Sequence, residues 1–256
     1  MTRHRFWLLA LGVLLAQAAL GQSPATRELL LNASRLKGLQ FPDDMACERG
    51  GTCTVVWDDG VFSEDDPPLF LGMRLWATVV SPAGGVVRER ILTEDPNTVL
   101  PTLASVGQRF AMFWDKNFGR PGERIEHVYQ WFGLDLEPRG ELVFLPAPPG
   151  RFGTVRKTVP IPGGFVQLVS ADDGTPTDPS DGTFLMFFDA TGRELHPPLR
   201  ANPEAAGEQR AWNGGLSVDP VTGIITVVYE QFSRDDDDPE TDVFYRRFSL
   251  DGKPLT

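Results

Sequence analysis

The sequence has few residues of the types that build most metal and nucleophile sites. Only two cysteines and three histidines occur among 256 residues. Because zinc sites are made mainly from Cys and His side chains, such a site within one chain is nearly excluded. The sequence also has no G-x-S-x-G motif that would mark a nucleophilic serine and no glycine-rich phosphate-binding loop. No catalytic motif therefore indicates an activity.

Basic residues are also scarce. The chain has 24 Lys and Arg against 35 Asp and Glu, a formal charge of −11. Proteins that bind phosphate backbones or anionic lipid surfaces neutralise that charge with basic side chains. The composition therefore predicts neither a nucleic acid nor an anionic membrane as a partner.

One apolar run stands at the N-terminus. Phe6 to Leu20 is apolar apart from Gln17, follows the basic Arg3-His4-Arg5, and precedes Gly21. This pattern predicts a signal peptide at residues 1–21, and the run is too short for a stable membrane span. A retained N-terminal helix is the alternative. The remaining chain would be secreted or periplasmic, without membrane insertion, and would carry 22 basic and 35 acidic residues.

The two cysteines flank a short glycine-rich turn. Cys47 and Cys53 enclose residues 48–52, a spacing that can join two antiparallel strands of one hairpin. Export favours oxidation, so a structural disulfide is predicted. A metal or redox pair is the alternative, although the C-x-x-C spacing and a nearby histidine are both missing.

Four segments have similar sequences and nearly equal spacing. Each is an apolar strand pattern that ends in an aromatic or small residue and continues into a Pro/Gly-rich loop. Their last residues are 57, 56 and 59 positions apart. Periods of this size are typical of stacked or radial architectures, in which no repeat buries its apolar face alone. The segments are 51–57, 108–114, 164–170 and 223–229.

Each repeat is expected to contain four antiparallel strands. A Pro- or Gly-containing strand leads in, and a third strand rich in β-branched and aromatic residues follows the loop. A glycine-containing hairpin turn then starts a fourth strand, for example at 86–92. The third strands are predicted at 74–80, 127–132, 183–188 and 243–248, and the turns at 81–85, 137–140, 189–192 and 251–252.

Four antiparallel strands in about 57 residues describe one blade of a β-propeller. The predicted fold is all-β, a propeller of four repeats in a single domain at residues 22–256. The last repeat has no room for a fourth strand, and 27–32 resembles the interior fourth strand at 88–93. An N-terminal strand at 27–32 is therefore predicted to complete the last blade and close the ring. A β-sandwich and a larger ring shared by two chains are the alternatives.

Two short patterns carry a family resemblance. Val55-Val-Trp-Asp-Asp59 and Tyr245-Arg-Arg-Phe-Ser-Leu-Asp-Gly252 resemble the G-x-x-V-x-V-V-W and R-R-F-x-x-D-G repeats of bacterial secreted β-propeller proteins. The resemblance touches all four repeats, although Ser170 replaces the aromatic residue in the third. It implies a propeller fold and export, and implies no particular activity.

The loops after the four segments occupy one position in the repeat, so they are expected on one face. Three of them are acidic, and carboxylates in flexible loops are the ligands that Ca²⁺ prefers. The loops are candidate calcium sites, with a solvated acidic surface as the alternative. The candidate ligands are Asp58, Asp59, Asp65, Asp172, Asp173, Asp178, Asp235, Asp236, Asp237, Asp238 and Asp242.

These observations lead to two hypotheses for function. The first is an exported, non-catalytic binding or scaffold propeller for a protein or glycan partner. The alternative is a glycoside hydrolase with two carboxylates at the central channel. Such an enzyme requires converging carboxylates, one of them with a pKa raised by burial. His127 and His196 are predicted to be structural or at the surface. Trp76, Trp131 and Trp212 are predicted to be core residues or a sugar-stacking platform.

Overall fold

We describe the chain from a computed structural model. The structure describes residues 40–65, 69–117, 123–147, 153–171, 182–202, 209–233 and 241–255. The predicted signal peptide at 1–21 and the predicted closing strand at 27–32 lie outside these residues, so both stay predictions. No helix long and apolar enough to cross a membrane occurs in the described part of the chain.

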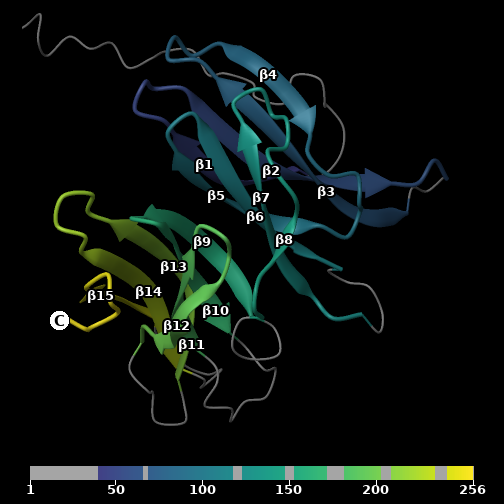
Figure 1. Cartoon of the computed structure of the whole chain (residues 1–256). Helices are drawn as coiled ribbons and strands as arrows, with labels where there is room; N and C mark the ends of the chain where they lie inside the picture. The colour runs from purple at the N-terminus through teal and green to yellow at the C-terminus, as the bar shows by residue number, and fades with distance from the viewer. Residues whose placement is uncertain are drawn as a thin grey trace, which may run out of the picture. The chain divides into compact units, whose positions relative to one another are not determined.

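The described residues form 15 β-strands (Figure 1). They are β1 (Gln40–Cys47), β2 (Cys53–Phe62), β3 (Phe70–Val80), β4 (Val86–Ile91), β5 (Val99–Val106), β6 (Arg109–Lys116), β7 (Glu126–Gly133), β8 (Val143–Phe144), β9 (Thr154–Ile161), β10 (Gly164–Ala171), β11 (Gly182–Asp189), β12 (Glu194–Arg200), β13 (Gln209–Val218), β14 (Ile225–Ser233) and β15 (Thr241–Phe248).

The strands form four antiparallel sheets, each made of strands that follow one another along the chain. Sheet 1 is β1-β2-β3-β4, sheet 2 is β5-β6-β7-β8, sheet 3 is β9-β10-β11-β12, and sheet 4 is β13-β14-β15. This confirms the all-β prediction and the four-strand repeat in the first three sheets. Four separate sheets also favour the propeller over the β-sandwich, which would need two facing sheets.

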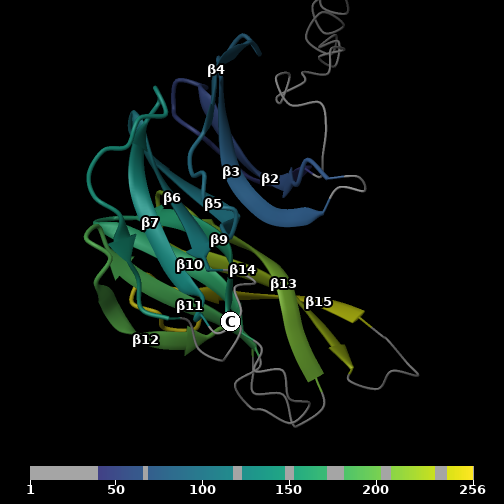
Figure 2. The same cartoon turned by 90° about the vertical axis from the view of Figure 1, so that its right-hand side faces the viewer.

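Successive sheets contact one another through their first strands. β1 contacts β5 (Figure 1), and β5 contacts β9, which contacts β13 (Figure 2). Apolar side chains fill the space between neighbouring sheets. One cluster joins sheets 1 and 2, a second joins sheets 2 and 3, and a third joins sheets 3 and 4.

The second strand of each repeat reads as a continuous apolar run because both of its faces are buried. In β6, Phe110 and Met112 pack in the cluster with sheet 1, whereas Ala111 and Phe113 pack in the cluster with sheet 3. Alternate residues of a strand point to opposite faces, so a strand between two sheets needs apolar residues at every position.

These second strands run further than the sequence pattern predicted. The predicted last residues were Trp57, Trp114, Ser170 and Tyr229, whereas β2, β6, β10 and β14 end at Phe62, Lys116, Ala171 and Ser233. Polar residues beyond the aromatic position continue the sheet because they have partners on the third strand. Asp59 lies opposite Arg74, and Asp115 lies opposite His127.

The hairpin after the third strand has the same geometry in all four sheets. The first residue donates its N–H to the carbonyl four residues later and accepts from the N–H three residues later. The residue three positions after the first, which donates the second of these hydrogen bonds, has a left-handed backbone, and this conformation favours glycine. In sheet 2 the turn spans Gly133 to Glu137, so the predicted turn at 137–140 is wrong. The left-handed residues are Gly84, Leu136, Gly192 and Gly252, with φ of 78°, 62°, 84° and 79°.

Candidate active site

Two neighbouring carboxylates stand in a bulge of β1. The pairing of β1 with β2 shifts register between Pro42 and Asp44, which leaves Asp43 unpaired in the ladder. A bulge redirects side chains that a regular strand would alternate between its two faces. Asp43 and Asp44 consequently make different contacts, one within sheet 1 and the other with sheets 2 and 3.

Asp43 is coupled to Asp58 on β2. The N–H of Asp58 donates to Oδ2 of Asp43 at 2.9 Å. Burial and the neighbouring charge of Asp58 raise the pKa of Asp43 to about 8, against the opposing effect of that hydrogen bond. Asp43 is half-buried, so it combines access to solvent with a carboxyl group that keeps its proton at neutral pH.

The side chain of Asp58 is only 3% exposed and lies at the interface of sheets 1 and 2. Its Oδ2 accepts the N–H of Leu100 at 3.3 Å, and its Oδ1 is buried without a hydrogen-bond partner among the described residues. Burial raises the pKa of Asp58 to about 7, the Leu100 N–H opposes this, and the charge of Asp115 adds to it. Asp43 and Asp58 therefore form a pair of carboxyl groups that titrate near neutral pH.

Asp44 binds across to the two following sheets. Its Oδ2 accepts the N–H of Leu103 on β5 at 2.8 Å, and its Oδ1 contacts the ammonium group of Lys157 on β9. One carboxylate thus joins the first strands of sheets 1, 2 and 3, and its charge is balanced by a lysine.

Asp115 on β6 is a further buried acid. Nδ1 of His127 on β7 lies 2.5 Å from Oδ1 of Asp115, and the two side chains are 6% and 3% exposed. Burial raises the pKa of Asp115, while His127 and Arg156 oppose that shift. His127, which the sequence predicts to be structural or at the surface, is therefore buried against Asp115. Asp43, Asp44, Asp58 and Asp115 together form an acid cluster.

Asp58 and Asp115 occupy equivalent positions in successive repeats. Each follows the tryptophan of its second strand, and the two positions are 57 residues apart. Each also interacts with the first strand of the next sheet, Asp58 with Leu100 on β5 and Asp115 with Arg156 on β9. The repeat therefore places one acid at the equivalent position of two successive sheet interfaces.

The candidate calcium ligands are distributed differently from the prediction. Asp58 and Asp59 are buried in β2 rather than in a loop, and Asp59 binds Nε of Arg74 at 3.3 Å. Asp65 is exposed in the loop after β2, and Asp242 is exposed on β15. Within the described ranges, no group of three or more His, Cys, Asp or Glu side chains is arranged so that it could hold a metal ion. The remaining candidates, Asp172, Asp173, Asp178 and Asp235 to Asp238, lie outside the described residues.

The tryptophans do not form one platform in the described residues. Trp76 is buried and stacks on Trp57 with ring centroids 6.2 Å apart. Trp131 packs against Phe165 and beneath the guanidinium of Arg109. The side chain of Trp212 is outside the part of the structure that is described. For Trp76, the core alternative is therefore the one observed.

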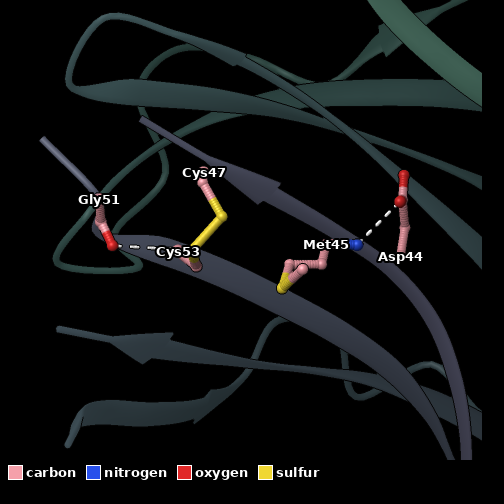
Figure 3. The surroundings of a disulfide bond; sticks show 5 residues. All are labelled: Asp44, Met45, Cys47, Gly51 and Cys53. Atoms are coloured by element: carbon pink, nitrogen blue, oxygen red, sulfur yellow. Dashed lines mark hydrogen bonds between the residues drawn. A yellow bond between two sulfur atoms is a disulfide. The ribbon is translucent and has the colours of Figure 1, made fainter. Parts of the chain in front are cut away.

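A disulfide between Cys47 and Cys53 closes the hairpin of β1 and β2 (Figure 3). This hairpin carries Asp43, Asp44, Asp58 and Asp59. The two cysteines are direct partners at the end of β1 and the start of β2. Figure 3 also shows Met45, whose N–H donates to Oδ1 of Asp44 at 2.7 Å. The bond therefore fixes β1 against β2 in the register that places Asp43 beside Asp58.

Five residues of the site are not among the predicted site residues: Asp43, Asp44, Asp115, Arg156 and Lys157. The one available signal was the repeat position that Asp115 shares with Asp58. No pattern pointed to Asp43 or Asp44, because their partners come from β2, β5 and β9.

No protein-family model and no curated protein matches the chain. Several solved structures with a similar fold are glycoside hydrolases, and another is an N-acetylgalactosamine deacetylase from F. plautii. The chain superposes on a thermostable family-43 glycoside hydrolase with a TM-score of 0.52 and 14% identity, covering 84% of this chain and 74% of that one. An alpha-L-arabinofuranosidase from Lactobacillus brevis gives 0.51 and 13%, with 83% and 74% covered.

An alpha-L-arabinanase from Penicillium chrysogenum, solved with arabinobiose, gives a TM-score of 0.57 and 12% identity. The match covers 81% of this chain and 62% of the arabinanase. These TM-scores show a common β-propeller fold. The resemblance to glycoside hydrolases corrects the expectation of a non-catalytic binding or scaffold propeller and favours the enzyme alternative.

Proposed function

We propose that the protein is a glycoside hydrolase whose chemistry is carried by Asp43 and Asp44. The observation that carries the proposal is the half-buried Asp43, whose pKa of about 8 keeps a transferable proton beside a second carboxylate. Glycosidases of most families require this combination of a protonated and an ionised carboxyl group. The fold shared with glycoside hydrolases supports it.

Asp43 is the proton donor in this proposal. It gives its proton to the glycosidic oxygen as the bond from that oxygen to the anomeric carbon breaks. Asp58 lies at the interface of sheets 1 and 2, where its Oδ2 accepts the Leu100 N–H, and in this proposal it acts on Asp43 and not on the substrate. Its charge raises the pKa of Asp43, and its N–H fixes the orientation of the Asp43 carboxyl group.

Asp44 is the base. Its carboxylate, oriented by Lys157 and the Leu103 N–H, takes a proton from water as the water oxygen bonds to the anomeric carbon. The charge of Asp115 adds to the burial that raises the pKa of Asp58. The predicted export of the chain suits an enzyme that acts on glycans outside the cell.

The test is hydrolysis by the full chain without its predicted signal peptide. A panel of aryl glycosides, including an α-L-arabinofuranoside, and of arabino- and xylo-oligosaccharides is scored for released sugar. We expect turnover of at least one substrate, and a loss of about 10²–10⁴-fold in kcat for Asp43→Asn and for Asp44→Asn.

The matched control is Glu141→Gln, which makes the same carboxyl-to-amide change at an exposed position. It should retain the wild-type rate, with circular dichroism used to verify that all variants fold. Turnover that persists in both Asp43→Asn and Asp44→Asn would show that other groups carry the reaction, and no turnover across the panel would refute the proposed activity.

A further inference from the structure

A pocket of about 330 Å³ lies next to the acid cluster, between the start of β3 and the chain that enters β5. Its lining comes from residues 70–73 and from Pro96, Asn97 and Val99. This volume is at the lower end of the range for small-molecule sites. The lining is mainly apolar, and the Asn97 carboxamide is its polar side-chain group.

The backbone that forms the pocket is fixed by close contacts. Met73 donates its N–H to the carbonyl of Pro96 at 2.6 Å, and Met73 pairs with Asn97 in a parallel bridge. Gly72 has a φ of 135°, and a Cβ at this position would lie 1.9 Å from the Pro96 oxygen. Only glycine allows this approach, so the pocket is a built feature of the fold.

An exposed aromatic side chain stands at the pocket. Phe70 is 52% exposed, and its ring packs edge-on against Phe62 with centroids 5.5 Å apart. Leu69 and Leu71 on either side are also more than half exposed. An aromatic ring that is held in place by a second ring, yet open to solvent, offers a flat apolar surface to a ligand with both apolar and polar faces.

The pocket lies close to Asp58, one of the acids. Met73 lies opposite Gly60, which is two residues beyond Asp58 on the same face of β2, so the two positions are about 7 Å apart along the strand. Val99 at the other wall precedes Leu100, whose N–H binds Asp58. A single oligosaccharide can therefore place one of its sugars in the pocket and its scissile bond at Asp43.

We propose that this pocket binds a sugar residue of the substrate beyond the bond that is cut, with Phe70 as the stacking surface and Asn97 as the hydroxyl partner. The substrate is then an oligosaccharide or polysaccharide rather than a single-residue glycoside. This inference rests on the proposed function for the identity of its ligand, although its test measures binding and not turnover.

The experiment uses the full chain with Asp43→Asn, so that bound sugars are not hydrolysed. Titration calorimetry follows the binding of arabino-, xylo- and galacto-oligosaccharides of two to six residues. We expect affinity to rise with chain length, and Phe70→Ala added to this background to weaken binding of the longer sugars by about tenfold.

The control is Phe144→Ala, which removes an equally exposed phenylalanine from β8. Phe144→Ala should leave the affinity unchanged. Equal affinity of the Phe70→Ala and parent proteins, or binding of none of the sugars, would overturn the pocket assignment. A dimer in solution that Phe70→Ala dissociates would also overturn it, because a second copy would then cover this surface.

The outcomes separate the two proposals. Binding that depends on Phe70, together with a wild-type chain that hydrolyses nothing, supports the pocket and refutes the hydrolase. Hydrolysis that depends on Asp43, together with sugar binding that is unchanged by Phe70→Ala, supports the hydrolase and refutes the assignment of the pocket as a sugar site.

Discussion

Single residues in this protein have properties that depend on their surroundings more than on their type. Asp43 and Asp58 are ordinary acids in the sequence, yet burial gives them pKa values of about 8 and about 7. Leu136 takes the left-handed backbone that three glycines take in the equivalent turns. Its side chain is fully buried between sheets 1 and 2, and that burial offsets the backbone strain.

The raised pKa values predict how stability changes with pH. The unfolded chain releases these protons near pH 4, whereas the folded protein keeps them until about pH 7 to 8. The free energy of unfolding should therefore fall as pH rises through this interval, by at most about 1.4 kcal/mol per pH unit for each proton. Urea denaturation between pH 5 and pH 8.5 measures this slope.

Asp43→Asn removes one of the two titrating groups. Its stability should fall less steeply over the same interval, and at pH 8 it should be at least as stable as the wild-type protein. Identical slopes for the two proteins would mean that Asp43 ionises at its ordinary pKa in the folded state.

At the scale of elements, the repeat was predictable because its signals are local. Alternating and continuous apolar patterns identified the second and third strands, and glycines identified three of the four left-handed turn positions. The second turn was misplaced because Leu136 carries no local signal for a left-handed backbone. The strand ends were placed too early because Asp58 and Asp115 look like loop residues until their partners on neighbouring strands are known.

The contact between β3 and the chain entering β5 gives an element-scale prediction. Gly72→Ala should lower the free energy of unfolding by about 2–4 kcal/mol, because the added Cβ meets the Pro96 carbonyl at 1.9 Å. Gly215→Ala is the control, since no heavy atom lies within 4 Å of a Cβ built there. Urea denaturation compares the two variants, and equal stability would contradict the close contact.

At the scale of the whole described domain, Asp44 and Lys157 connect sheets that are far apart in sequence. The Asp44 side chain is 8% exposed and that of Lys157 is 29% exposed. Together with the Leu103 N–H, this pair holds the first strands of three sheets in one arrangement. The geometry of the acid cluster therefore depends on how the sheets pack, and not on one hairpin alone.

Removing the lysine tests this connection. Lys157→Met should cost about 3 kcal/mol, because it leaves the charge of Asp44 buried without its cation. The double variant Asp44→Asn with Lys157→Met should lose less than the sum of the two single variants. Thermal and urea denaturation complete the cycle, and additive losses would mean that the two groups do not interact in solution.

The sequence by itself determined the all-β repeat, the third strands and most turns, because strand pairing within a hairpin depends on residues close together in the chain. Only the tertiary structure decided which acids matter. Asp44 meets Leu103 and Lys157 across 59 and 113 positions, and Asp58 meets Leu100 across 42. A carboxyl group changes its pKa when other strands remove water from it and bring charges near, and those strands are neighbours only after the sheets have packed.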